Sequence, residues 1–271
     1  MCNIQMPKAA LCFLISYNNT IAKEAIWKEW VHELNDHVNV YIHYNPRIQL
    51  RSPWVIEHAM PRQLLASTSY YNVVPAYLSI LRYAMSQDEE NVWFCMLTES
   101  CAPCVGPRDF TTLLEKYANQ SIIKWSPPWW NVQFSKRANL RYINPDLHMG
   151  NDPWFVITRE DAKICVAFPQ KHIKLYNIIQ RGEIANESIF AIMLRYYKRL
   201  RFVVNKSTHI TDWSRMSSRT SPYVFVTENK YDYDYIMKQK TTNEHVMFVR
   251  KVHEKFPDTL LRRIIGLEDT T

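Results

Sequence analysis

The sequence predicts an α/β fold in which a mostly parallel central sheet is flanked by helices. One observation is a strand–helix–strand opening: an apolar strand over Ala10–Ser16, an amphipathic helix from Ile21 to about Leu34, and a strand over Asn39–His43. A second is that the apolar runs are continuous, as in strands covered on both faces. A third is the length of 271 residues, which one core can accommodate, so residues 1–271 are predicted to form a single domain.

The remaining elements follow in chain order from hydrophobic spacing and turn residues. The predicted segments are a short strand at Trp54–His58, a loop at Ser67–Asn72, a helix at Val74–Met85, a strand at Val92–Leu97, a helix at Phe110–Asn119, a strand at Ile122–Trp125, an irregular loop over 126–152, a strand at Trp154–Thr158, a helix at Arg159–Phe168, strands at Thr208–Trp213 and Tyr223–Thr227, a short helix at Tyr231–Lys238, a strand at Met247–Val252, and a closing helix with Arg262 and Arg263 on its surface.

A carboxylate, Glu187, stands where a further helix is predicted to start. Asn186 is a good N-cap, and apolar residues recur after it at helical spacing from Ile189 to Leu200. In the first turn, Glu187 would feel the positive end of the helix dipole, which favours the ionised form that a general base needs. The alternative is that Glu187 is an ordinary acidic residue at a helix N-terminus, without a catalytic role.

Composition limits the classes of partner. The formal net charge of +7 suits an anionic partner such as a sugar-nucleotide diphosphate, a nucleic acid or a membrane surface. The cations are scattered and no nucleic-acid-binding motif occurs, so nucleic acid is not an expected partner. Only 4 glycines are present, without a Gly-rich phosphate-loop motif. No run of 18 or more apolar residues encodes a membrane span, and a cytoplasmic or otherwise soluble protein is expected.

One cysteine pair and one aspartate pair have the spacing of redox or metal sites. The six cysteines show no disulfide-framework spacing, and reduced thiols are expected. Cys101 and Cys104 have C-x-x-C spacing, but a second pair and a clear histidine partner are missing, so a structural role is predicted. Asp232 and Asp234 spell Asp-x-Asp away from any strand end, and they are interpreted as part of a solvated turn.

Several short segments, in the right order, resemble one enzyme family. WFVITREDA, from Trp154 on, is similar to the aromatic-Phe-Val-x-Ser/Thr-Arg-x-x-Ala/Val segment of the core-2/I-branching β-1,6-N-acetylglucosaminyltransferases and their xylosyltransferase and plant relatives. IHYNP at 42–46, TESCAP at 98–103, THITDW at 208–213 and MFVRKV at 247–252 resemble further family elements. The resemblance implies a GT-A-like domain, with a donor half over about residues 1–125 and an acceptor and catalytic half over about 126–271.

The resemblance also implies the site residues. Glu187 matches the catalytic base, although the family's preceding Asp is Asn186 here. Because the family is metal-independent and uses basic side chains on the diphosphate, no metal or other cofactor is expected. The residues expected to bind the donor are Ser16, Asn45, Glu99, Trp213, Arg219, Arg250 and Lys251, and those expected to bind the acceptor are Trp154 and Trp130. Asn45 replaces a family Asp and brings no charge.

The expected activity is that of an inverting, metal-independent glycosyltransferase. It would move a sugar from a UDP-sugar to an acceptor hydroxyl on a glycan or glycoprotein, with N-acetylglucosamine as the family's commonest donor sugar and xylose as the alternative. Family members resident in the Golgi carry an anchor and stem that this sequence does not show. The competing hypothesis is a non-catalytic carbohydrate- or nucleotide-binding module on a degenerate transferase fold, because Asp is missing at two family positions.

Overall fold

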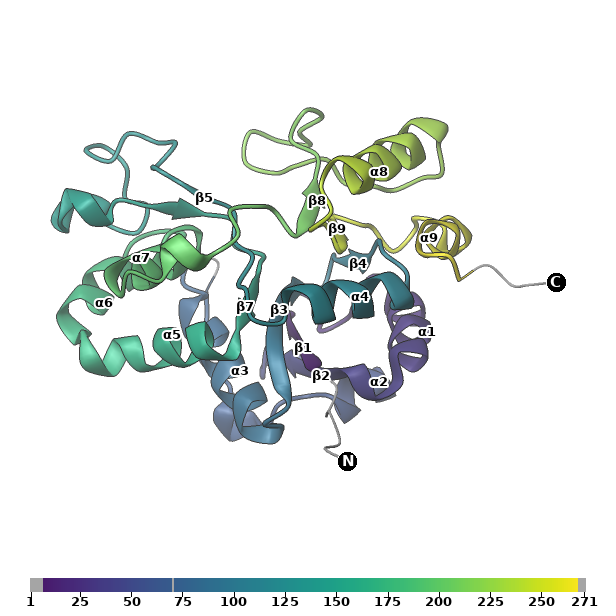
Figure 1. The fold of residues 1–271 in the computed structure, drawn as a ribbon, viewed down its shortest axis with the longest axis horizontal. Helices are drawn as coiled ribbons and strands as arrows, with labels where there is room; N and C mark the ends of the chain where they lie inside the picture. The colour runs from purple at the N-terminus through teal and green to yellow at the C-terminus, as the bar shows by residue number, and fades with distance from the viewer. Residues whose placement is uncertain (1–6, 70, 268–271) are drawn as a thin grey trace.

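A computed structural model describes residues 7–69 and 71–267, and a four-stranded sheet lies at its centre (Figure 1). Strand β1 (Lys8–Leu14) pairs in parallel with β2 (Val38–His43) and β3 (Asn91–Thr98), and β7 (Val156–Thr158) pairs antiparallel with β3. The strand order is β2-β1-β3-β7. Helix α1 (Glu24–Leu34) connects the parallel strands β1 and β2. The predicted strand–helix–strand opening is therefore confirmed.

Two smaller sheets complete the strand pairing. One joins β4 (Ala102–Pro103), β9 (Phe248–Arg250) and β8 (His209–Thr211), and the other joins β5 (Trp125–Ser126) and β6 (Gly150–Asn151). Three of the pairings between these described strands are parallel and three are antiparallel. The expected parallel arrangement is therefore found between β1, β2 and β3, whereas β7 joins the central sheet antiparallel and makes it mixed. A continuous apolar run indicates burial on both faces but not strand direction.

Helices form the rest of the regular structure. The other α-helices of the described residues are α2 (Pro53–Glu57), α3 (Val74–Gln87), α4 (Pro107–Tyr117), α5 (Arg159–Lys171), α6 (Ile173–Gln180), α7 (Ile189–Tyr196), α8 (Lys230–Thr242) and α9 (Asp258–Ile265). Short 3-10 turns are η1 (Asn35–His37), η2 (Arg62–Leu64), η3 (Leu140–Tyr142), η4 (Pro145–Leu147), η5 (Ala185–Glu187) and η6 (Leu200–Phe202). The helices predicted near α3, α4, α5 and α9 are confirmed, and α8 is longer than predicted.

The core has one cluster on each face of the central sheet. Leu11 and Phe13 of β1 point into a cluster with α1, α4 and α9, whereas Ala10 and Cys12 point into a cluster with α3, α5 and α7. Figure 1 shows these two helix groups on opposite sides of the sheet. Both faces of β1 are therefore dry, which explains why its sequence is apolar without alternation.

Three predicted strands differ in the structure. Trp54–His58 lies mostly within α2, because Pro53 occupies a first-turn position and the Ser52 hydroxyl accepts the Val55 N–H at 3.3 Å. The segment predicted at 223–227 is reduced to a single bridge between Phe225 and Val252. The strand predicted at 122–125 is reduced to bridges at Ile122 and the start of β5. Sequence pattern detected these apolar segments but not their conformation.

No helix in the part of the chain described by the structure combines the length and apolar character needed to cross a bilayer.

Candidate active site

Glu187, the predicted catalytic carboxylate, ends the 3-10 turn η5 immediately before α7. The prediction that Asn186 caps the helix and that Glu187 lies in its first turn is wrong. Helix α7 begins at Ile189, and Ser188 occupies the N-cap position without a side-chain hydrogen bond. Glu187 is therefore held by the turn rather than by the helix.

Asn151 on β6 supplies the missing cap from a distant part of the chain. Its side-chain oxygen accepts the Ala191 N–H at 3.2 Å, and its amide nitrogen donates to the Asn186 carbonyl at 2.9 Å. Ala191 is the third residue of α7, where the backbone N–H has no partner within the helix. One buried side chain thus holds both the start of α7 and the turn that carries Glu187.

Glu187 forms an ion pair with Arg137. The guanidinium donates to the carboxylate at 2.5 Å, and the two side chains are 29% and 24% exposed, respectively. The guanidinium also lies 5.3 Å from the centre of the Trp130 ring. Because neither partner is fully enclosed, a ligand can approach the carboxylate from solvent.

The electrostatic environment of Glu187 differs from the one predicted. Burial raises the pKa of Glu187 above its ordinary value, and the nearby Asp152 carboxylate raises it further. The charges of Arg137 and Arg250 lower this pKa but do not cancel the effect of burial. We expected a helix dipole to favour the ionised form; instead, desolvation dominates. A carboxylate with a raised pKa is a stronger base than an exposed one.

Arg250 lies close enough to three carboxylates, those of Glu187, Glu99 and Asp152, for its charge to lower their pKa values. It ends β9, and its guanidinium lies 5.2 Å from the centre of the Trp154 ring. Its Nε is buried, and no described residue offers it a hydrogen bond. Burial lowers the pKa of Arg250, whereas Glu99 and Asp152 are among the groups that raise it. Arg250 is therefore a desolvated cation with an unused donor.

Lys251 and Glu99 are two further charged residues close to Arg250. Burial and the charge of Arg250 lower the pKa of Lys251, and Glu99 opposes this change. Burial raises the pKa of Glu99, against a hydrogen bond from Thr98 at 2.7 Å and the charges of both cations. Lys251 also donates to the Ser221 hydroxyl at 3.3 Å. Glu99 follows the carboxyl end of β3, where ligands bind in open α/β sheets.

Ser16 and Asn45 lie beyond the carboxyl ends of β1 and β2, as predicted from their positions. The Asn45 amide donates to the Ser16 carbonyl at 3.5 Å, and its oxygen accepts the Arg47 N–H at 3.0 Å. The buried Asn19 side chain donates to the carbonyls of Asn45 and Ile48 at 2.9 and 2.8 Å. The amide of Asn45 thus builds the turn in this structure, and Ser16 is exposed.

Trp213 and Arg219 lie on the loop that follows β8, and both side chains are exposed. Arg215 anchors this loop, because its guanidinium forms ion pairs with Asp212 at 2.6 Å and Asp232 at 2.7 Å. Among the described residues, no hydrogen bond or ion pair joins the Trp213 or Arg219 side chain to Arg250 or Lys251. The loop does contact Lys251 elsewhere: the Lys251 side chain donates to the Ser221 hydroxyl at 3.3 Å, and the Phe225 N–H donates to the Lys251 carbonyl at 2.8 Å.

Two tryptophans predicted to contact the acceptor lie beneath the two arginines. Trp154 stacks on Tyr77 with ring centres 5.9 Å apart and faces Arg250, whereas Trp130 faces Arg137. The indole N–H groups of both tryptophans are buried without a partner among the described residues. Each arginine thus makes a cation–π contact with one of these tryptophans.

The interpretation of Asp232 as part of a solvated turn is wrong. Asp232 lies in the first turn of α8 and is fully buried, whereas Asp234 is exposed. The Asn229 side chain accepts the Asp232 N–H at 2.7 Å and so caps the N-terminus of α8. This N-cap was not predicted from the sequence. The two carboxylates face different environments, and Asp232 is already paired with Arg215.

The C-x-x-C cysteines are free, buried thiols. Burial raises the pKa of both Cys101 and Cys104 to about 12, so neither is a reactive thiolate at neutral pH. Among residues 7–69 and 71–267, no three His, Cys, Asp or Glu side chains form a group suited to a metal ion.

Sequence reasoning missed Arg137, Asp152 and Tyr77. Arg137 lies 50 residues before its partner Glu187, inside the segment predicted to be an acceptor-side loop. Asp152 follows β6, and Tyr77 on α3 donates to the Pro153 carbonyl at 2.9 Å beside it. Only the loop assignment was a signal for Arg137, whereas Asp152 and Tyr77 had none, because their roles depend on tertiary contacts.

Comparison with protein families gives a match that covers most of the chain. A family model described as Core-2/I-Branching enzyme matches residues 11–240 of the 271. No protein with a curated description matches the chain. The matched region contains Glu187, Arg137 and both tryptophans, and it ends before Arg250 and Lys251.

Proposed function

This chain belongs to the Core-2/I-branching enzyme family, a family of glycosyltransferases, and from that premise we propose that it is an inverting, metal-independent transferase acting on a UDP-sugar. One observation carries the proposal. A partly buried carboxylate, Glu187, and a partly buried guanidinium, Arg250, are close enough for the charge of Arg250 to lower the Glu187 pKa. The reaction needs these two charges, one to accept a proton and one to receive negative charge.

Glu187 acts as the general base in this mechanism. Its carboxylate takes the proton from an acceptor hydroxyl as that oxygen forms a bond to the anomeric carbon of the donor sugar. General-base help of this kind is worth roughly 10²–10⁴-fold in rate. Arg137 holds the carboxylate in its ionised form until the acceptor arrives, because its charge opposes the effect of burial on the Glu187 pKa.

Arg250 and Lys251 receive the leaving group. As the bond from the anomeric carbon to the diphosphate breaks, the departing UDP gains negative charge. A desolvated guanidinium stabilises this developing charge without reorganising solvent. The neighbouring ammonium, already close to Arg250 and Glu99, adds a second donor. These two cations take the place of a divalent metal in the proposal.

Substrate placement follows from the same arrangement. We place the nucleotide over the strand ends at Ser16, Asn45 and Glu99, with the exposed Trp213 and Arg219 closing over it. The acceptor, a glycan or glycoprotein, lies against the rings of Trp154 and Trp130, which pack beside Arg250 and Arg137. Residues 1–125 thus serve mainly the donor, and residues 126–271 the acceptor and the chemistry. N-acetylglucosamine is the preferred donor sugar, with xylose as the alternative.

The test is Glu187→Gln, with Glu183→Gln as the matched control. Glu183 is an exposed glutamate four residues earlier on the same segment, so its amide variant removes one carboxylate without touching the site. Glu187→Gln should lower kcat by roughly 10²–10⁴-fold while UDP binding, measured by calorimetry, stays close to wild type. The control should retain activity. Turnover retained in Glu187→Gln removes the base from its role.

A binding module is the competing function, and one observation keeps it in view. Asn45, which stands where the family has an Asp, uses its amide within its own turn. A panel of nucleotide sugars, screened for thermal stabilisation and then for turnover, separates the two functions. Stabilisation with neither transfer nor hydrolysis would favour the binding module.

A further inference from the structure

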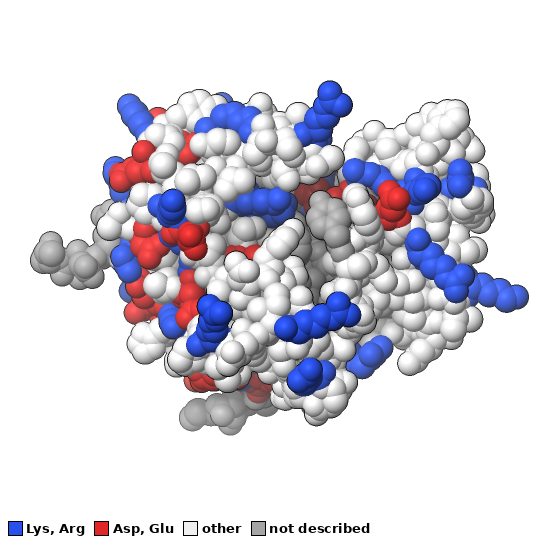
Figure 2. Space-filling view, turned by 180° about the vertical axis from the view of Figure 1, so that it is seen from behind, with Lys and Arg blue, Asp and Glu red and all other residues white. Residues whose placement is uncertain are grey.

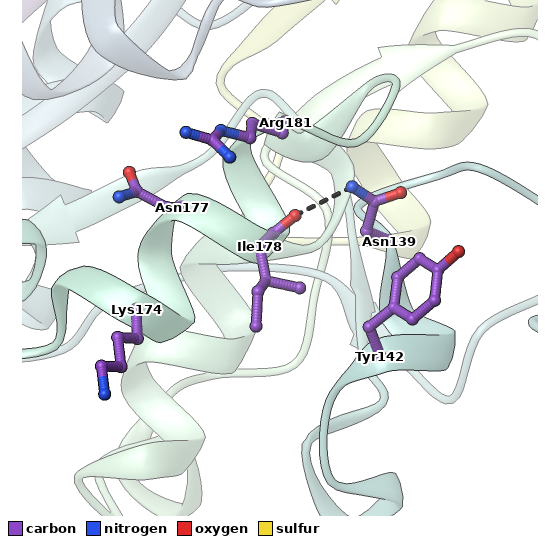
Figure 3. Close-up of a pocket in the computed structure, with 6 residues that line it drawn as sticks. All are labelled: Asn139, Tyr142, Lys174, Asn177, Ile178 and Arg181. Carbon is purple, nitrogen blue, oxygen red and sulfur yellow. Dashed lines mark hydrogen bonds between the residues drawn. The ribbon is translucent and has the colours of Figure 1, made fainter.

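A cavity of about 480 Å³ lies beside the segment that carries Glu187. It is lined by Asn139, Tyr142, Lys174, Asn177, Ile178 and Arg181. Figure 3 shows Lys174, Asn177 and Arg181 along one side of α6, with Ile178 between them and the Tyr142 ring. Cavities of this size hold small ligands or one end of a larger one.

Helix geometry explains why these groups share a face. Lys174, Asn177, Ile178 and Arg181 are spaced i, i+3, i+4 and i+7, which places them on one stripe of α6 and its final turn. No carboxylate of the described residues forms an ion pair with Lys174 or Arg181, and both side chains are exposed. In Figure 2, most of the charged residues visible on the right-hand side, where α5–α7 lie after the 180° turn from Figure 1, are Lys and Arg. The cavity is therefore a site of positive charge that the fold itself does not neutralise.

Tight backbone packing couples this cavity to the candidate active site. The Ala138 N–H donates to the Glu183 carbonyl at 2.9 Å, and the Asn139 side chain donates to the Ile178 carbonyl at 3.0 Å. A Cβ on Gly182 would come within 2.4 Å of the Asn139 backbone nitrogen, so the two segments approach as closely as only glycine allows. The segment from Arg137 to Tyr142 thus presents Arg137 to Glu187 and, within five residues, Tyr142 to the cavity.

We propose that this cavity binds a carboxylate-bearing sugar residue of the acceptor glycan, an inference that rests on the proposed transferase function. Lys174 or Arg181 supplies the donors for the carboxylate, since the two lie about two helical turns apart along α6, and the Asn177 amide can bond sugar hydroxyls. The Tyr142 ring, 60% exposed, offers a flat apolar surface for the face of a sugar ring. An acceptor whose hydroxyl reaches Glu187 extends its acidic residue into the cavity.

Direct binding to oligosaccharides tests the proposal. The probes are a trisaccharide of galacturonic acid and the neutral galactose trisaccharide, which differ in their carboxylates. The double variant Lys174→Ala/Arg181→Ala is compared with Lys163→Ala/Lys171→Ala, which removes two exposed charges from α5, outside the cavity. The wild type and the control should bind the acidic probe at least about tenfold more tightly than the neutral one, and the cavity variant should lose this preference.

The same preparations are assayed for UDP-sugar hydrolysis, which needs no acceptor. Hydrolysis in all variants, with no acidic preference in the wild type, overturns the cavity proposal and leaves the transferase function intact. Absence of hydrolysis in the wild type counts against the transferase function instead. An equal loss of preference in both double variants, or tighter binding of an aspartate-rich peptide than of the acidic trisaccharide, also overturns the cavity proposal.

Discussion

Arg250→Met removes a partly buried cation that forms no ion pair with a carboxylate of the described residues. Methionine is an unbranched apolar side chain that can fill much of the space over Trp154. The change removes the cost of burying a charge and loses a cation–π contact worth about 0.5–2 kcal/mol. These terms have opposite signs, so the substitution should not lower the free energy of unfolding by more than about 1 kcal/mol.

Catalysis should respond much more strongly than stability. If Arg250 stabilises the departing diphosphate, its removal resembles the loss of one preorganised donor at a developing anion. Such a loss costs about 10²–10³-fold in kcat, or about 2.7–4 kcal/mol. Initial rates with a saturating acceptor, together with thermal unfolding of the same preparation, measure the two quantities side by side.

Arg215→Met is the matched control, because Arg215 has the opposite arrangement. Its ion-pair partners Asp212 and Asp232 have side chains that are 0% exposed, so the substitution leaves two buried carboxylates uncompensated. Breaking a buried pair in this way costs about 3–5 kcal/mol, which should lower the Tm by roughly 10 °C. Near-wild-type kcat/KM in Arg250→Met, or a loss of Tm as large as in Arg215→Met, would refute the reasoning.

Three further results are expected. Arg137→Met should move the acid limb of the rate profile, measured over roughly pH 5 to 8, to higher pH, because Arg137 lowers the Glu187 pKa and the base must be ionised; an unmoved limb contradicts this. EDTA should leave the rate nearly unchanged, since a lone Glu99 is a poor cation clamp, and strict Mn²⁺ dependence would exclude the metal-free mechanism. Burial lowers the pKa of His43 to about 4. Between about pH 6.5 and 4 the unfolded chain therefore binds a proton that the folded protein does not, and the free energy of unfolding should fall by on the order of 3 kcal/mol over this range. His43→Gln, which can still accept the Ala66 N–H but does not titrate, should flatten that slope in denaturant unfolding.

Local pattern predicted the elements whose side chains are buried on two faces. The runs around β1, β2 and β3 are apolar because two core clusters cover the central sheet, and this burial is visible in the sequence. The same pattern failed at Trp54, where Ser52 and Pro53 start a helix, and near Phe225, which is buried without forming a strand. The parallel direction of β1, β2 and β3 was predicted, but the antiparallel direction of β7 was missed because it depends on how the chain returns to the sheet.

The candidate site was predicted in part, for a related reason. Glu187 and Arg250 are 63 residues apart in sequence, and only the resemblance of separate segments suggested that they meet. The environment of Glu187 was predicted incorrectly, because Arg137, Asp152 and the cap from Asn151 all come from a loop without a helical or strand period. Long-range hydrogen bonds and desolvation leave no periodic trace in a sequence.

The double hydrogen bond of Asn151 has a mechanical consequence. Strands β5 and β6 flank the loop that bears Trp130 and Arg137. The Asn151 side chain on β6 is hydrogen-bonded to the turn before α7, at the Asn186 carbonyl, and to the Ala191 N–H in the first turn of α7. We expect a displacement of strands β5 and β6 to be transmitted to the Glu187 turn through these two hydrogen bonds. If the proposed acceptor binds on the loop that bears Trp130, the distance between this loop and Glu187 would then be kept when either one moves.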